Sequence, residues 1–95
     1  MPQRRLIIRV HALKRMAQRK ISEADIRHVL EKGETIEEYP QDKPYPSRLV
    51  LGWGDERPIH IVAARNDLDE ETIVVTVYVP DPAKWEDCFR RRKHP

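Results

Sequence analysis

Pro58-Ile-His-Ile-Val-Ala-Ala-Arg65 and Thr72-Ile-Val-Val-Thr-Val-Tyr-Val79 are the two stretches that decide the fold of this chain. Both are rich in β-branched residues, and the polar segment 66–71 between them is typical of a loop that joins antiparallel strands. Because side chains alternate along a strand, each stretch has one apolar face that must be buried. The residues predicted on this buried face are Ile59, Ile61, Ala63, Ile73, Val75, Val77 and Val79.

The opposite face of this hairpin carries side chains that suit chemistry. If both apolar faces lie on the same side of the sheet, His60 is near Thr76 or Tyr78 across the ladder. The same alternation in the strand predicted at 47–53 adds Arg48 to this polar face. Arginine binds phosphate oxyanions and histidine transfers protons near neutral pH, so the set suits a phosphate diester. Ordinary strand residues on a solvated face would give the same pattern. Under either interpretation we expect His60 to lie on an exposed face and to contribute little to the core.

Two helices are predicted before the hairpin. Residues 4–9 form a short extended lead-in, and the apolar spacing then predicts a helix over 10–20. The second helix begins after Ser22, a favourable N-cap with Asp25 at the third helical position, and Gly33 stops it.

Two more strands precede the central hairpin. The first, at 34–39, is expected at a sheet edge because three of its six residues are glutamate. A loop with three prolines follows, and then the strand at 47–53. This strand would turn Leu49, Leu51 and Trp53 towards the helices and Arg48 and Val50 away from them.

Contiguous strands favour an antiparallel sheet whose apolar face is covered by the helices. After the sheet, Asp81 as N-cap and Pro82 at the first helical position predict a short C-terminal helix. Its docking residues would be Trp85, Cys88 and Phe89. We therefore predict a single α+β domain, residues 1–95, with two layers. Two N-terminal helices pack on a four-stranded, mainly antiparallel sheet, and the short C-terminal helix follows.

Composition and charge limit the classes of function. Cys88 is the only cysteine, which excludes an internal disulfide and a cysteine-based metal cluster. No stretch has the length and apolarity of a membrane span or signal-peptide core, so we expect a cytoplasmic protein without a membrane partner. Residues 1–20 hold seven Lys or Arg and no acid, and residues 90–93 are all basic, whereas 21–42 and 66–89 are acidic. This segregation suits a polyanion such as RNA, and equally well ion pairs between elements.

A second candidate pair lies on the first predicted helix. His11 and Arg15 are four residues apart, so they are neighbours on one helix face near its N-terminus. The helix dipole there favours a neutral imidazole, which a general base requires. A solvated basic helix is the alternative interpretation. A helix on the apolar face can also reach the polar face only around a sheet edge. Tyr45, beside the proline loop, suits either stacking on a base or packing of that loop.

Several motifs resemble one bacterial family. They are His11-Ala-x-x-Arg15-Met, Arg19-x-Ile-Ser22, Gly33-Glu-x-Ile-Glu-Glu-Tyr-Pro40, Tyr45-Pro-Ser-Arg-Leu-Val-Leu-Gly52, His60-Ile-Val62 and Thr76-Val-Tyr-x-Pro-Asp-Pro-x-x-Trp85. The chain resembles a family classed as a domain of unknown function, number 4258. That family is similar to the RelE, BrnT and MqsR toxin ribonucleases, which have an α+β fold and cleave RNA without a metal. The resemblance implies a fold of the RelE and barnase type and an antitoxin partner. It also implies catalytic-site roles for His11, Arg15, His60, Thr76 and Tyr78.

The leading hypothesis is therefore a toxin-like endoribonuclease that needs neither metal nor cofactor. His60 and His11 would transfer protons, and Arg15 or Arg48 would stabilise the phosphate. The residues expected to bind RNA are Tyr45, Arg48, Arg90, Arg91 and Arg92. Two rival hypotheses are an RNA-binding module without catalysis and a protein-interaction module that binds an antitoxin-type protein. The oligomeric state stays open.

Overall fold

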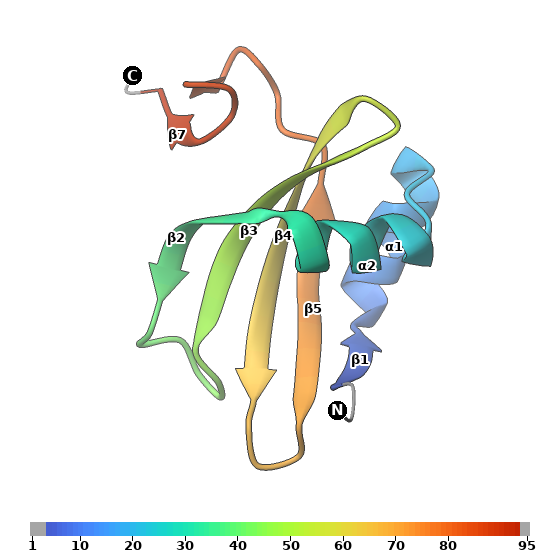
Figure 1. The fold of residues 1–95 in the computed structure, drawn as a ribbon, viewed down its shortest axis with the longest axis vertical. Helices are drawn as coiled ribbons and strands as arrows, with labels where there is room; N and C mark the ends of the chain where they lie inside the picture. The colour runs from blue at the N-terminus through green and yellow to red at the C-terminus, as the bar shows by residue number, and fades with distance from the viewer. Residues whose placement is uncertain (1–3, 94–95) are drawn as a thin grey trace.

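A five-stranded sheet forms the centre of the computed structural model, which describes residues 4–93 (Figure 1). The elements are β1 (Arg5–Ile8), α1 (Val10–Arg19), α2 (Glu23–Lys32), β2 (Glu34–Tyr39), β3 (Ser47–Gly54), β4 (Arg57–Asn66), β5 (Glu71–Tyr78), β6 (Trp85–Glu86) and β7 (Arg91–Arg92). The strands of the large sheet lie in the order β1-β5-β4-β3-β2. β1 is parallel to β5, and the other pairs are antiparallel. The predicted edge position of β2 is confirmed.

The predicted α+β class, with four strands and a C-terminal helix, is wrong. Residues 5–8, expected as a lead-in, form a fifth strand that makes the sheet mixed. Strands take up 44% of the described residues and helices 22%. Among residues 4–93, no helix follows the sheet, and a small β6–β7 sheet takes its place. The pairing of β1 with β5 joins residues more than sixty positions apart, so a local sequence pattern cannot predict it.

The C-terminal segment forms a hairpin because its backbone and its tryptophan both oppose a helix. The Asp81 side chain does cap a turn, accepting from the backbone N–H of Ala83 at 2.9 Å. Three later residues have left-handed backbone, with φ of 54°, 52° and 69° at Asp87, Cys88 and Phe89. A right-handed helix cannot contain that conformation. A short helix has a costly nucleus, so burial of Trp85 against the sheet outweighs the cap.

Side chains of both helices join the main core on one face of the sheet, where α2 packs against β3 and β4 and α1 packs against β5. α2 begins with the predicted capping box, in which Ser22 and Asp25 each accept from the other's backbone N–H. α2 also lies very close to β3, because a Cβ at Gly52 would be 2.7 Å from a Val29 methyl group. The buried residues of this core are Ala12, Met16, Ile21, Ile26, Val29, Val50, Ile59, Ile61, Ala63, Val74 and Val77.

The predicted faces of β3 and β5 are partly wrong. In β3, Val50 faces the helices opposite Ile61, so Leu49 and Leu51 point to the other side and Arg48 to the helix side. Three consecutive residues of β3, Leu49, Val50 and Leu51, are each at most 3% exposed, so alternation could not distinguish the two faces.

In β5, a β-bulge between Val62 and Ala63 of the neighbouring strand changes the alternation. Val74 is fully buried, whereas Val75 is 37% exposed. The bulge adds one unpaired residue to β5, and every side chain before it changes face relative to a regular ladder.

Candidate active site

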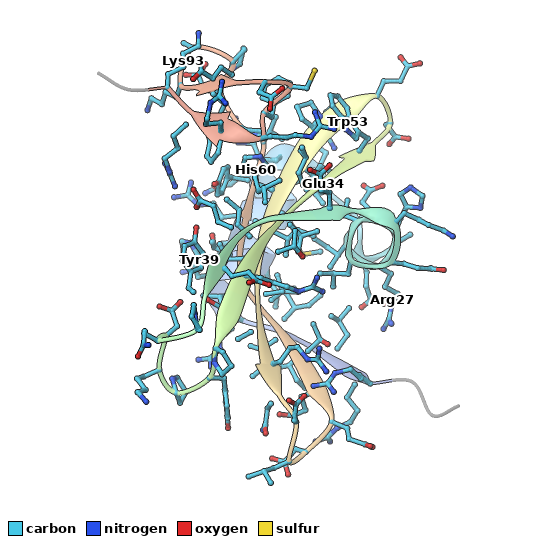
Figure 2. All side chains as sticks on the ribbon, turned by 60° about the vertical axis from the view of Figure 1, so that its left-hand side comes forward. Arg27, Glu34, Tyr39, Trp53, His60 and Lys93 are labelled. Atoms are coloured by element: carbon cyan, nitrogen blue, oxygen red, sulfur yellow. The ribbon has the colours of Figure 1, made fainter. Side chains whose placement is uncertain are left out.

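The sheet face turned away from α1 and α2, which we call the distal face, carries most of the predicted site residues. The register pairs His60 with Tyr78 and Val62 with Thr76, so these four side chains share this face. The β6–β7 hairpin covers one end of it. Figure 2 shows His60 beneath the segment that carries Lys93, while Arg27 of α2 lies on the opposite side of the sheet.

His60 is fully buried on this face, so the expectation that it lies in solvent is wrong. The centroid of its ring lies 4.4 Å from that of the Trp85 ring. Its Nε2 lies 2.9 Å from the backbone oxygen of Phe89, and its Nδ1 lies 3.2 Å from the Tyr78 hydroxyl. A carbonyl can only accept, so Nε2 carries the proton and Nδ1 accepts the hydroxyl of Tyr78. The C-terminal hairpin buries the imidazole, and the alternation of residues in the strands did not predict this hairpin.

Burial keeps His60 neutral. Loss of solvent lowers the pKa of His60 below its ordinary value. The Phe89 carbonyl raises that pKa, and the nearby positive charge of Arg92 lowers it further. A neutral imidazole with both nitrogens engaged cannot reach a substrate without breaking a buried hydrogen bond. His60 therefore holds Tyr78 and the C-terminal hairpin in place.

Tyr78 contacts His60 directly, and Tyr39 and Arg92 lie close enough on the distal face for their charges to interact with this group. Burial raises the pKa of Tyr78, and burial together with the bond to the Glu37 carboxylate raises the pKa of Tyr39 to about 12. The charge of Arg92 acts on both hydroxyls in the opposite direction. Its guanidinium lies 4.7 Å from the centroid of the Trp85 ring and forms no ion pair within residues 4–93. Among residues 4–93, the site thus combines two protonated phenols and the Glu37 carboxylate with one cation that has no ion-pair partner.

His11 reaches the distal face around the edge of the sheet. β1 ends at Ile8, and α1 then packs against β5. The Nε2 of the exposed His11 consequently lies 3.0 Å from Thr76 Oγ1. Arg15 is exposed one helical turn further on, with Gln18 as its hydrogen-bond partner. The geometric objection to a site containing both helix and sheet residues therefore does not hold.

The structure separates one predicted RNA-binding residue, Arg48, from this site and pairs two others with acidic side chains. Arg48 lies on the helix side of the sheet, where it donates to Thr35 Oγ1 at 2.9 Å, because the faces of β3 are the reverse of those predicted. Arg90 forms an ion pair with Glu34, and Arg91 forms one with Glu86, both at 3.1 Å.

Tyr45, also predicted to bind RNA, stays close to the site. Its ring lines a hollow on the distal face, and its hydroxyl accepts from Asn66.

Sequence reasoning missed Glu37 and the way Trp85 and Phe89 cover His60. Glu37 lies on an edge strand whose glutamates look like protection against aggregation, and Phe89 contacts His60 through its backbone oxygen. Neither contact has a local signal. Among the described residues, no three His, Cys, Asp or Glu side chains gather into a group that could hold a metal ion.

Fold and site together define a small mixed-sheet domain whose polar groups gather on the helix-free face of the sheet. The chain belongs to the family described as Domain of unknown function (DUF4258), whose profile matches residues 8–79. The matched segment contains His11, Arg15, His60, Thr76 and Tyr78 and ends before the β6–β7 hairpin. No curated protein and no solved structure matches the chain. No helix within residues 4–93 has the length and apolarity needed to cross a membrane.

Proposed function

We propose that this protein is a metal-independent endoribonuclease that cleaves RNA on the distal face. The contact between His11 and Thr76 carries the proposal, because it places an exposed imidazole beside the hydroxyl row of β5. Tyr78 continues that row two residues later, and Arg92 supplies a cation close to it. An imidazole, hydroxyls and a cation on one face are the groups that cleavage at a ribose 2′-hydroxyl requires.

The proposed reaction is attack of the ribose 2′-oxygen on the adjacent phosphorus. His11 accepts the 2′-hydroxyl proton as general base while the new P–O bond forms. Arg92, and Arg15 beside His11 on α1, stabilise the charge that develops on the phosphate oxygens. The P–O5′ bond then breaks, the leaving oxygen takes a proton from water, and the hydroxide that remains takes back the proton that His11 accepted. The products are a 2′,3′-cyclic phosphate and a 5′-hydroxyl.

The remaining site residues position the substrate. The Tyr78 O–H is held by His60, so its oxygen lone pairs are free to accept from the ribose. The suggested kinship with RelE, BrnT and MqsR leads to the same substrate class. None of the comparisons supports that kinship, so the proposal rests on the side chains alone.

The test is cleavage of a labelled RNA by purified protein, with and without a chelator. We expect activity in the chelator and products that end in 2′,3′-cyclic phosphate. His11→Ala should lower the rate by about a hundredfold to ten-thousandfold, the usual effect of losing a general base, and leave RNA binding intact. His28→Ala is the matched control, because His28 is an exposed histidine on α2. Cleavage that needs added divalent metal, or full activity of His11→Ala, would overturn the proposal.

A protein-interaction function is the second candidate, and an exposed apolar stripe on α1 favours it. Val10 is 67% and Leu13 48% exposed, and Ile7 of the neighbouring β1 is 38% exposed. The surrounding segment 1–20 is basic without any acid, so two copies of this surface would repel each other. The stripe suits an acidic amphipathic segment of a partner protein of the antitoxin type. Such a partner would lie next to His11.

A designed amphipathic helix with glutamates around a leucine stripe is the probe for this candidate. We expect calorimetry to detect its binding to the wild-type protein and to the control Leu68→Asp, which alters the 96%-exposed Leu68 of the β4–β5 loop. Leu13→Asp should abolish binding by placing a repelling charge on the stripe. Equal affinity of the two variants would exclude the stripe as the docking surface.

A further inference from the structure

A small hollow on the distal face adjoins the contact between His11 and Thr76. Its volume is about 190 Å³. Its walls are the apolar or aromatic side chains of Pro44, Tyr45, Val62, Ala64 and Val75. The mechanism proposed above uses none of these residues.

The register places this hollow directly beside the proposed reacting groups. Val62 is paired with Thr76 across the β4–β5 ladder, and Val75 precedes Thr76 in the chain. The β-bulge leaves Val75 37% exposed at the hollow, where a regular strand would bury it on the helix side. Bulges commonly redirect side chains next to active sites.

The size of the hollow limits its occupant. Sites for whole small molecules measure about 300–1,000 Å³, so 190 Å³ suits a single planar ring system of a larger ligand. The Tyr45 ring is held in place because its hydroxyl accepts from Asn66 Nδ2 at 3.2 Å. A fixed aromatic ring with aliphatic neighbours is a stacking platform for a nucleobase.

The rim of the hollow carries charges that suit the phosphates of the same ligand. Arg9 and Lys43 both line it, and neither forms an ion pair within the described part of the chain. Asp42 also lines it, but its carboxylate already accepts from the Ser47 hydroxyl. Arg9 is two residues from His11, so a phosphate bound there would be close to the proposed general base.

We propose that this hollow is a nucleobase subsite. It takes the base of a nucleotide adjoining the cleaved phosphate, and Arg9 and Lys43 contact the backbone phosphates. This inference rests on the proposed function, because it assumes that single-stranded RNA is the ligand of the distal face.

The test uses a 2′-deoxy dinucleotide, which can bind but cannot be cleaved by 2′-hydroxyl attack. We expect it to perturb the NMR signals of Tyr45 and Val75 in the wild-type protein. Val75→Phe fills the hollow from an already exposed position and should weaken binding about tenfold to a hundredfold, the effect of one lost stacked base. Lys43→Gln should also weaken binding, whereas Lys14→Gln, on the exposed side of α1, should not. A circular dichroism spectrum equal to that of the wild type verifies that each variant is folded.

The experiments distinguish failure of the nucleobase subsite from failure of the ribonuclease proposal. If Val75→Phe blocks the dinucleotide but no RNA is ever cleaved, the subsite stands and the ribonuclease proposal fails. If RNA is cleaved in a His11-dependent way while Val75→Phe binds the dinucleotide as the wild type does, the subsite is excluded and the ribonuclease proposal stands. Absence of any dinucleotide-induced change at Tyr45 in the wild-type protein would also overturn the subsite.

Discussion

At the residue scale, His60 connects three parts of the molecule. Its ring packs against Trp85, its Nε2 donates to Phe89, and its Nδ1 accepts from Tyr78. A polar group that is fully buried must have its hydrogen bonds satisfied, and here both ring nitrogens have a partner. His60 therefore positions its neighbours, although an exposed histidine at this position would suit catalysis. The exposed imidazole of the candidate site is that of His11.

His60→Ala should destabilise the protein by about 2–5 kcal/mol, the range for truncating a large buried side chain. Part of the loss comes from the Tyr78 hydroxyl and the Phe89 carbonyl, which lose their partner. Urea unfolding measures the change, with the exposed His28→Ala as a control expected within about 0.5 kcal/mol of wild type. A histidine exposed on a strand would instead leave the free energy of unfolding almost unchanged when replaced by alanine. Equal stability of His60→Ala and wild type would mean that the hairpin does not cover the imidazole in solution.

At the element scale, the β6–β7 hairpin gives three consecutive arginines different partners. Arg90 and Arg91 pair with the acidic side chains of Glu34 and Glu86. Arg92 stacks on Trp85, and its charge partly offsets the rise that burial causes in the pKa of Tyr39 and Tyr78, so this charge acts on the distal face. Of these three arginines, only Arg92 has no ion-pair partner among residues 4–93.

Arg92→Gln should weaken RNA binding and make it less sensitive to salt. Each phosphate contact that is lost lowers the slope of log K against log salt by about 0.7 for a single strand, because fewer counterions are released. Arg91→Gln is the matched control and should leave the slope nearly unchanged. Fluorescence anisotropy with a short labelled RNA over a range of salt concentrations measures both. Identical losses in the two variants would show that the tail binds RNA by charge alone.

At the scale of the whole molecule, the two faces of the sheet carry different kinds of side chains. The helix side holds the main core and gives stability, and the distal side combines the buried His60 with the half-buried hydroxyls of Thr76 and Tyr78 and the exposed His11. The distal face is only partly covered, because the short β6–β7 hairpin stands where a third helix was expected. A small domain can in this way present a polar site on a rigid sheet.

The stability of the whole molecule should fall at both ends of the pH range. His60 has a lowered pKa in the folded state, so the unfolded chain binds more protons, and stability is lost as pH falls below about 6.5. Tyr39 has its pKa raised to about 12, so the stability from its protonated hydroxyl is lost as pH rises above about 10. Urea unfolding between pH 5 and 11 measures both slopes. His60→Gln should flatten the acid slope. A wild-type protein that gains stability from pH 7 to 5 would contradict this assignment.

The sequence by itself determined the local elements of this protein. α1, α2 and the β4–β5 hairpin follow from apolar spacing, from the capping box of Ser22 and Asp25, and from β-branched runs. Each of these signals lies within about ten residues, so neighbouring side chains suffice to define the element. The sequence also indicated the candidate residues His11, His60, Thr76 and Tyr78, and the structure brings them together in two contacts, between His11 and Thr76 and between His60 and Tyr78.

Only the tertiary structure decided the rest, because the deciding contacts join distant parts of the chain. β1 pairs with β5 across more than sixty residues, and Phe89 reaches His60 across 29. The central residues of β3 are buried on both faces of the sheet. Their alternation therefore does not show which face Arg48 lies on. The bulge at Val75 and the hairpin over His60 exist because burial of Val74 and Trp85 outweighs regular pairing and a weak helix cap. Packing free energy depends on the whole fold, which a local sequence pattern does not contain.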